Sequence, residues 1–315
     1  MKLFLKIFFL LLLPSLLMGQ EKNFRNEFGF RSDNDAYLAL GQDQYYTNGL
    51  IVSFRHALRP STRVSKTVKK IFEVEGGQLL YNPNSGESPL IGDVDRPFAA
   101  YLFGGVRMNW LKENEQIYQA SLQYGTIGPN ALGKEVQETL HNTVGFYKIK
   151  GWQYQLYNES GLNASFGYSR LIGRPNQRND FSLNSYALIG STFSGAGAGL
   201  LFRSGTINKL TNSAMSASRI SNSKLDTIPP EEFFFFARPS LHYVAYNATI
   251  QGGLFRENKG PVSHDPNRFL FSQELGVMYA KKRWTLNFSI TFQSKETRNQ
   301  EDSHQYGSAS VFYRF

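Results

Sequence analysis

The sequence has no cysteine among its 315 residues. Disulfide bonds therefore cannot stabilise the chain, and a lipid-modified N-terminal cysteine is excluded. Beyond the first twenty residues, no stretch reaches the roughly 18 consecutive apolar residues that a membrane-spanning helix needs. Acidic side chains are also in deficit, since 25 acidic residues against 34 basic ones give a formal net charge of +9. Stability must come from burial or lipid contact, and the charge favours anionic partners.

The N-terminus has the layout of a secretory signal peptide. Lys2 and Lys6 precede an apolar core over 8–13. We expect a signal peptide over 1–20 and one mature domain over 21–315. The two signal lysines account for two of the nine net charges, which leaves +7 on the mature chain. For an exported protein this charge favours phosphate-bearing lipid over nucleic acid, and no nucleic-acid partner is expected.

Alternation of apolar and polar residues with period two recurs along the mature chain, which is typical of half-buried strands. Along 284–293, one face carries Trp284, Leu286, Phe288, Ile290 and Phe292, and the other carries Thr285, Asn287, Ser289, Thr291 and Gln293. Similar pairs of faces occur at 115–127 and 159–170. One face suits lipid and the other a polar lumen, as in a transmembrane barrel. The chain also ends on an aromatic residue, Phe315, as outer-membrane barrels commonly do.

The pattern predicts an all-β fold, a single transmembrane antiparallel barrel of about 12 strands. The expected strands are 24–32, 46–57, 70–81, 97–110, 115–127, 159–170, 180–192, 196–204, 234–250, 268–280, 283–294 and 305–315. An even count places both termini on the periplasmic side. The polar stretch 205–233 then lies on that side, where turns are usually short. A soluble β-sandwich is the competing interpretation, which the signal peptide, the lipid-like faces and Phe315 disfavour.

This topology gathers polar residues at the outer rim, in the loops 33–45, 82–96 and 128–158. Within the last loop, apolar residues recur every four positions, at Leu132, Val136, Leu140 and Val144. This period predicts a short amphipathic helix over 131–144 in an extracellular loop. Gln137 and His141 are also four apart, so they share a neighbouring face of that helix.

The rim residues suit ester hydrolysis. His141 is a natural base, since an unperturbed imidazole titrates near pH 6.5. Asn34 and Asp35 offer oxygen ligands for a hard cation such as calcium, which polarises a carbonyl. Each also has a simpler interpretation: Asn34 and Asp35 as turn formers, His141 as a solvated side chain, and Arg96 as the ion-pair partner of Asp95.

Taken together, these segments resemble the outer-membrane lipid A 3′-O-deacylase family across most of 24–170. The resemblance is carried by Asn34-Asp35, Asp43-Gln44-Tyr45-Tyr46-Thr47-Asn48-Gly49, Asp95-Arg96-Pro97-Phe98-Ala99, Gly128-Pro129 through Gln137 to His141, Gly151-Trp152-Gln153-Tyr154-Gln155 and Asn158-Glu159. Two positions depart from the family pattern, because Gln44 stands where a basic residue is expected and Asp33 where glutamate is commoner. The stretch 205–233 matches nothing in the family pattern.

The resemblance implies a calcium-dependent hydrolase that removes the 3′-linked acyloxyacyl group of lipid A. It implies His141 as general base, Asp35 as calcium ligand, and Asn34 and Thr47 as groups that bind calcium or the oxyanion. It further implies that Gln137 orients the histidine and that Arg96 contacts a lipid A phosphate. The expected partners are lipid A or lipopolysaccharide and the bacterial outer-membrane bilayer, with the protein a monomer and its site facing the cell exterior.

Three alternatives stay open on the sequence alone. An outer-membrane phospholipase would also hydrolyse lipid with calcium, but it would need a serine nucleophile near the histidine, and Ser32 is the nearest candidate by topology. A non-enzymatic channel or adhesin would need an open lumen, whereas twelve strands give a narrow barrel that Tyr, Gln and Arg side chains can fill. A family member that has lost catalysis is disfavoured because Asn34, Asp35, Thr47 and His141 are all present.

Overall fold

The computed structural model describes residues 23–38, 43–59, 66–223 and 226–315. The expected signal peptide at 1–20 lies outside these residues and stays a prediction. Within them the chain forms twelve strands: β1 (Asn26–Asn34), β2 (Tyr46–Leu58), β3 (Thr67–Tyr81), β4 (Ala99–Lys112), β5 (Gln116–Ile127), β6 (Glu159–Asn176), β7 (Asn179–Gly190), β8 (Phe193–Thr206), β9 (Glu231–Asn247), β10 (Phe269–Lys281), β11 (Trp284–Gln293) and β12 (His304–Arg314).

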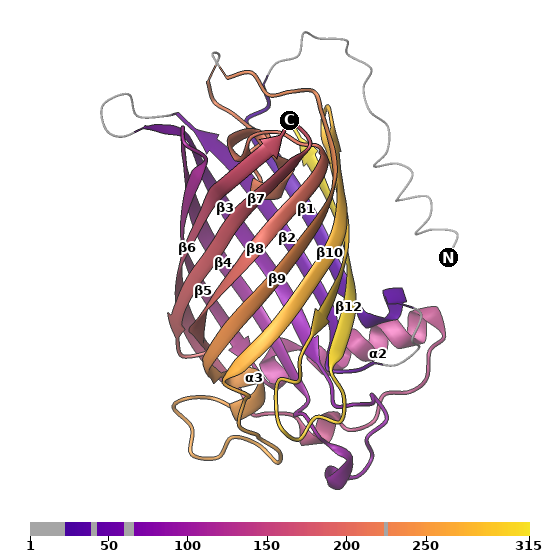
Figure 1. Ribbon diagram of the computed structural model, residues 1–315. Helices are drawn as coiled ribbons and strands as arrows, with labels where there is room; N and C mark the ends of the chain where they lie inside the picture. The colour runs from indigo at the N-terminus through magenta and orange to yellow at the C-terminus, as the bar shows by residue number, and fades with distance from the viewer. Residues whose placement is uncertain (1–22, 39–42, 60–65, 224–225) are drawn as a thin grey trace.

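The strands close into one antiparallel barrel (Figure 1). Each strand pairs with its sequence neighbours, and β1 pairs with β12 to close the cylinder. The prediction of an all-β barrel of about twelve strands is thereby confirmed. No helix in the described part of the chain is long and apolar enough to cross a membrane. We call the end where β1 begins and β12 finishes the terminal end, and the opposite end the rim.

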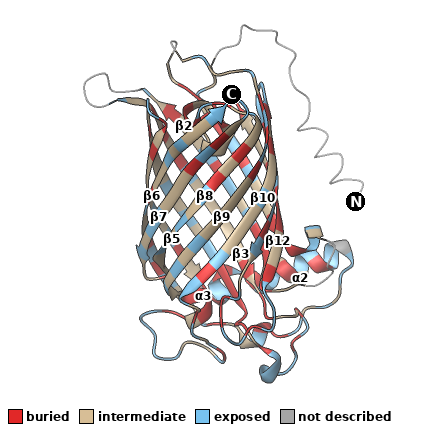
Figure 2. Cartoon of the chain, viewed as in Figure 1, coloured by how far each residue is buried: buried red, intermediate tan, exposed pale blue. Residues whose placement is uncertain are grey.

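The wall has an apolar outer face and a polar inner face. On β11, Phe288 is 56% exposed, whereas its neighbour Ser289 is 6% exposed. On β5, Leu122 and Tyr124 are exposed, while the Ser121 hydroxyl faces inward and lies 2.6 Å from that of Ser165. Figure 2 shows the resulting alternation of exposed and buried residues along the strands. The two faces predicted from period two are both present.

Charged side chains cross-link the interior of the barrel. Arg55 bonds Glu27 at 2.7 Å and Glu73 at 2.6 Å. Arg107 bonds the other oxygen of Glu73 and also Glu75, both at 3.0 Å. Because each buried charge has an opposite partner, the polar lumen does not carry the penalty of unpaired ions.

Several strand boundaries differ from the sequence prediction, and β9 and β6 are two examples. The expected strand 234–250 is one unbroken strand, as predicted, but it ends at Asn247 and the short helix α3 (Ala248–Gln251) follows. The side chain of Asn247 accepts a hydrogen bond from the Thr249 N–H and so caps this helix. The expected strand 159–170 is longer and continues to Asn176. Local capping and tertiary pairing set these ends, and alternation alone does not reveal them.

The stretch between β8 and β9 fills the terminal end of the barrel. It carries two short 3-10 helices, η5 (Leu210–Asn212) and η6 (Ala214–Ser216), and we call residues 207–222 the plug. Leu210 and Ile220 of the plug are buried against inward-facing apolar residues of four strands, namely Ala57, Ile71, Leu111 and Ile117. A plug that packs inside the wall explains why this stretch is longer than a simple periplasmic turn.

Buried ion pairs and hydrogen bonds fix the plug in place. Arg203 of β8 is fully buried and bonds Asp180 at 2.6 Å and the Ser213 hydroxyl at 2.7 Å. Ser213 in turn donates to Glu232 of β9 at 2.7 Å. Lys69 of β3 donates to the Ser218 carbonyl at 2.7 Å. The plug is therefore bound to both sides of the lumen, which obstructs a continuous channel.

We expect Arg203→Met to destabilise the protein by about 3–5 kcal/mol, because it leaves Asp180 and Glu232 buried without their shared cation. Urea unfolding in detergent micelles, followed by tryptophan fluorescence, measures this loss. Arg178→Met is the matched control, since Arg178 is exposed on the nearby β6–β7 turn. A loss below about 1 kcal/mol in Arg203→Met would contradict a structural role for this cluster.

Candidate active site

The first two strands bring two acidic residues together at the rim. β1 ends at Asn34, and the 3-10 helix η1 (Asp35–Leu38) begins with Asp35. Asn34 pairs in the sheet with Asn48, so the end of β1 lies beside the start of β2. Asp43 precedes β2 by three residues and therefore lies close to Asp35. The order of the two strands alone produces this acidic pair.

The helix α2 (Gly133–Val144) carries the candidate base. It begins after Leu132, whose φ is 56°, and ends at Gly145, whose φ is +81° and whose N–H bonds the His141 carbonyl at 2.9 Å. Glycine adopts this left-handed conformation without strain, which makes it a common helix terminator. Figure 1 shows α2 lying outside the cylinder, beside the rim and next to η1. The helix predicted over 131–144 is confirmed, with its start two residues later.

Asp35 is a buried carboxylate held by neutral donors. It is 3% exposed, its Oδ2 accepts from the Gln44 N–H at 2.7 Å, and its Oδ1 lies 3.3 Å from the Thr47 hydroxyl. Burial raises the pKa of Asp35 to about 8, and the negative charge of Asp43 also raises it. Ionisation of Asp35 is therefore unfavourable here unless a positive charge comes beside it.

Asp43 links this acidic pair to the helix. Its Oδ1 accepts from the Thr47 hydroxyl at 2.9 Å, and its Oδ2 lies 3.1 Å from Nε2 of His141. The Tyr147 hydroxyl also donates to Oδ2. Thr47 has a single hydroxyl proton, so it donates to Asp43 in preference to the more distant Asp35. The hydroxyl of Thr47 therefore sits between the two carboxylates.

Both ring nitrogens of His141 contact neighbouring groups of the protein. Its Nδ1 lies 2.8 Å from the Tyr147 carbonyl, and because a carbonyl only accepts, Nδ1 carries a proton. The ring is 3% exposed and packs edge-on against the Tyr147 ring, with the centroids 5.1 Å apart. The proton on Nδ1 and the ring packing fix the orientation of the imidazole and leave Nε2 as its reactive nitrogen, whose contact with Asp43 is a hydrogen bond when the two groups share a proton. Nε2 points at Asp43, toward the acidic pair.

Gln137 anchors the helix and does not bond to the histidine in this arrangement. Its side-chain oxygen accepts from the Trp152 indole N–H at 2.9 Å, in a fully buried contact. Its side-chain nitrogen is buried and has no hydrogen-bond partner among the described residues. Trp152 also packs on Phe98, with ring centroids 5.3 Å apart. Gln137 thus ties α2 to the rim, and its buried amide N–H groups are left without a partner among the described residues.

The guanidinium of Arg96 is buried inside the protein and is not exposed to a lipid phosphate, contrary to expectation. It is fully buried, bonds Glu296 at 2.8 Å and Thr249 at 3.1 Å, and stacks over the Tyr81 ring at 4.2 Å. Its guanidinium therefore joins three separate loops and strands at the rim. The simpler interpretation, a pair with Asp95, is also wrong, because Asp95 accepts from the Tyr45 hydroxyl at 2.8 Å.

Asn34 has the local role that its turn chemistry indicated. Its side-chain oxygen accepts from the Ala36 N–H at 2.7 Å, which turns the chain from β1 into η1. His141, Asp35 and Thr47 are brought together as expected, through Asp43. Sequence reasoning gave no role to Asp43, Tyr147 or Trp152, although Asp43 and Trp152 stand in the quoted motifs. Asp43 precedes Thr47 by four residues at the start of β2, and this spacing of two oxygen-bearing side chains is a signal that could have indicated a shared site.

The oxygen atoms beside η1 fit a hard cation. The carboxylates of Asp35 and Asp43 and the hydroxyl of Thr47 are ligand types that calcium prefers. The raised pKa of Asp35 reflects a burial that a divalent cation would compensate. Across the described ranges, no group of three or more Asp, Glu, His or Cys side chains is placed to hold a metal ion. Neutral oxygen atoms or water would therefore have to complete the shell.

A closed cylinder with an apolar outer belt and a polar lumen defines the class of outer-membrane β-barrel proteins. The family model described as "Outer membrane protein LpxR" matches residues 3–315. The chain therefore belongs to the LpxR family. This confirms the resemblance to the outer-membrane lipid A 3′-O-deacylases and extends it from 24–170 to nearly the whole chain.

Among solved structures, one shares the fold and others match more weakly. LpxR from Salmonella typhimurium matches with a TM-score of 0.73 at 21% identity, over 92% of this chain and 100% of that one. The β domain of the Bordetella autotransporter BrkA matches at 0.47 and 10% identity, over 93% of this chain and 100% of that one. A KdgM porin matches at 0.42 and 8%, over 92% and 99%. No curated protein matches the sequence.

We expect Trp152→Phe to loosen α2, because it leaves the Gln137 side-chain oxygen buried without its donor. Such a loss costs about 1–3 kcal/mol, so amide hydrogen exchange over 133–144 should rise about tenfold or more. Trp284→Phe, on the outer face of β11, is the matched control and should leave this exchange unchanged. Equal exchange in Trp152→Phe and wild type would show that the indole does not hold the helix.

Proposed function

We propose that this protein is a calcium-dependent hydrolase that removes the 3′-linked acyloxyacyl group of lipid A, acting as a monomer in the outer leaflet of the outer membrane. The observation that carries the proposal is the chain of contacts from His141 through Asp43 and Thr47 to Asp35. It joins a base, an oxygen-rich cation site and the outside of the barrel wall. Membership of the LpxR family supports the same activity.

His141 would act as the general base. Nε2 takes a proton from a water molecule while the water oxygen bonds to the ester carbonyl carbon. The tetrahedral intermediate then breaks its bond to the sugar 3′ oxygen, which leaves with the proton returned by His141. The products are a sugar hydroxyl and a free acyloxyacyl acid. Because Asp43 occupies Nε2 in the resting arrangement, the water must take the place of Asp43 at that nitrogen.

Asp35 and Thr47 would hold the cation. Calcium, when bound, supplies polarisation of the ester carbonyl and stabilises the charge that develops on its oxygen. Asn34 would help by shaping the turn that presents Asp35, and the free amide N–H groups of Gln137 are a further donor for the oxyanion. Arg96 is left out of the substrate contacts, since it is fully buried.

The position of the site suits a lipid substrate. α2 and η1 lie outside the cylinder, so a lipid in the bilayer can approach from the side without entering the lumen (Figure 1). Exposed apolar residues surround the site, including Tyr37, Leu140 and Phe146. We place the rim at the cell exterior, because its loops are the longer ones and the strand count puts both termini at the other end.

Two alternatives receive less support. A serine-dependent phospholipase needs a serine at His141, but the Ser32 hydroxyl bonds the Tyr37 hydroxyl at 2.8 Å, and His141 bonds Asp43 and Tyr147. A channel needs an open lumen, but the plug fills the terminal end and ion pairs cross the interior.

We expect His141→Ala to lower lipid A deacylation by at least about 10²-fold, because it removes the general base. Mass spectrometry of lipid A from a host that expresses each variant measures the loss of the acyloxyacyl group. His264→Ala, which changes another rim histidine that bonds the Val94 carbonyl, should keep full activity. Unchanged lipid A together with cleaved phospholipids in the wild type would instead support the phospholipase.

We expect Asp35→Asn to raise the calcium concentration for half-maximal activity by more than about tenfold, since it removes one ligand charge. Calcium should also protect the wild type against thermal unfolding, and this protection should shrink in Asp35→Asn. Asp93→Asn, in the exposed 3-10 helix η2 (Ile91–Asp93), serves as the control. Full wild-type activity in excess chelator would overturn the role of calcium.

A further inference from the structure

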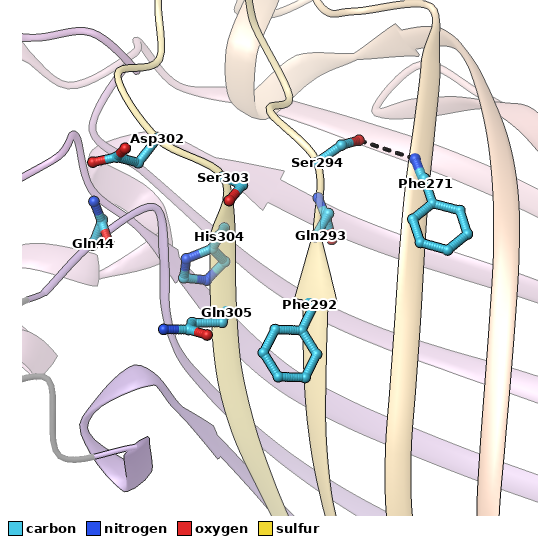
Figure 3. Close-up of a pocket in the computed structure, with 9 residues that line it drawn as sticks. All are labelled: Gln44, Phe271, Phe292, Gln293, Ser294, Asp302, Ser303, His304 and Gln305. Carbon is cyan, nitrogen blue, oxygen red and sulfur yellow. Dashed lines mark hydrogen bonds between the residues drawn. The ribbon is translucent and has the colours of Figure 1, made fainter.

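A cleft of about 500 Å³ opens at the rim beside the candidate active site. It lies over the ends of β10, β11 and β12 and the loop that joins the last two (Figure 3). β12 is the sheet neighbour of β1, which leads into η1 and Asp35. The volume falls in the range of small-molecule sites. We call it the outer cleft.

The membrane side of the outer cleft is apolar. Phe271 of β10 is 50% exposed and Phe292 of β11 is 42% exposed. Both belong to the outward-facing series that forms the lipid belt of the barrel. Figure 3 shows their rings on neighbouring strands below the loop residues. Acyl chains can therefore continue from the bilayer onto this floor without crossing a polar surface.

The rim side of the outer cleft is polar but carries little charge. Its lining there consists of amide and hydroxyl side chains, Gln44, Gln293, Ser294, Ser303 and Gln305, with Asp302 as the one charged residue among the lining residues. Neutral amides and hydroxyls suit sugar hydroxyl groups and amide-linked acyl chains. A phosphate would meet Asp302 and no lysine or arginine in the lining. The cleft thus favours the uncharged part of an acylated amino sugar.

His304 offers a specific acceptor in the same lining. It is 5% exposed, and its Nε2 donates to the Tyr46 carbonyl at 2.9 Å. In the neutral ring Nδ1 is then an acceptor, yet it is buried without a hydrogen-bond partner among the described residues. Buried polar atoms are seldom left unpaired unless a ligand or water completes them. A ligand hydroxyl is the group that matches this acceptor.

The outer cleft is connected rigidly to the candidate active site. Gln44 lines the cleft, and its backbone N–H bonds Asp35 at 2.7 Å. The Tyr45 hydroxyl accepts from the backbone of Glu301 at 3.1 Å and of Asp302 at 3.2 Å. The loop that walls the cleft is therefore bonded to the segment that precedes β2 and carries Asp43. A ligand in the cleft that contacts Gln44 therefore touches the segment that also holds Asp35.

We propose that the outer cleft binds the neutral acylated sugar of the substrate while the scissile ester reaches His141. This inference rests on the proposed function, since it assigns a subsite of the same reaction. It makes the outer cleft, and not only the catalytic contacts, responsible for choosing an acylated saccharide over a glycerophospholipid. The rings of Phe271 and Phe292 favour acyl chains. The glutamine amides of the lining and His304 favour hydroxyl groups, and Asp302 disfavours a phosphate at this position.

The test is a binding measurement that does not need turnover. In a His141→Ala background, Ser303→Trp fills the outer cleft, and Ser160→Trp makes the same change at an exposed position near the rim end of β6. The purified proteins are titrated with lipid A, and separately with phosphatidylglycerol, in mixed detergent micelles. We expect Ser303→Trp to weaken lipid A binding at least tenfold and Ser160→Trp to change it less than twofold. Phosphatidylglycerol binding should be equal in both.

The outcomes separate this inference from the proposed function. Equal lipid A affinity in Ser303→Trp and Ser160→Trp overturns the subsite, even if the enzyme with His141 intact deacylates lipid A. An equal loss for lipid A and phosphatidylglycerol also overturns it, because the cleft would then bind acyl chains without reading the sugar. A selective loss of lipid A binding in Ser303→Trp supports the subsite. If the protein with His141 intact also leaves lipid A unchanged, the subsite stands and the proposed function is removed.

Discussion

The pairing of β1 with β12 is the constraint on which the rest of the structure depends. In a bilayer every backbone N–H and C=O must find a partner within the protein, and only a closed ladder leaves no edge. This ladder runs from Glu27 opposite Arg314 to Asn34 opposite Gly307. It also brings the end of β1, with Asp35 just beyond, next to the loop that precedes β12. The closure that satisfies the backbone hydrogen bonds in the bilayer therefore also assembles the candidate active site and the outer cleft.

Much of the barrel could be predicted from the sequence, because apolar and polar residues alternate along a strand that faces lipid on one side and the lumen on the other. The twelve segments, their order and the parity of the termini all follow from that pattern, and β11 shows it from Trp284 to Gln293. The plug could not be predicted, since residues 207–222 have no periodicity. Their contacts depend on Arg203 and Lys69, which lie on strands that the sequence pattern marks only as inward-facing.

The candidate site was predictable in its placement but not in its contacts. Topology put Asp35, Thr47 and His141 at one end of the barrel. The contacts between them run through Asp43, whose bond to Tyr147 spans 104 residues of sequence, and no local pattern reveals such a distant partner. Arg96 illustrates the same limit. Its neighbour in sequence suggested an ion pair, whereas the actual partner, Glu296, lies 200 residues away.

The site lies on the outside of the wall, and this separates two demands that many membrane proteins must reconcile. An interior that the proposed reaction does not use can hold ion pairs such as those of Arg55, and the plug can occupy its terminal end. A cell can then carry many copies of the protein without weakening the permeability barrier of its envelope.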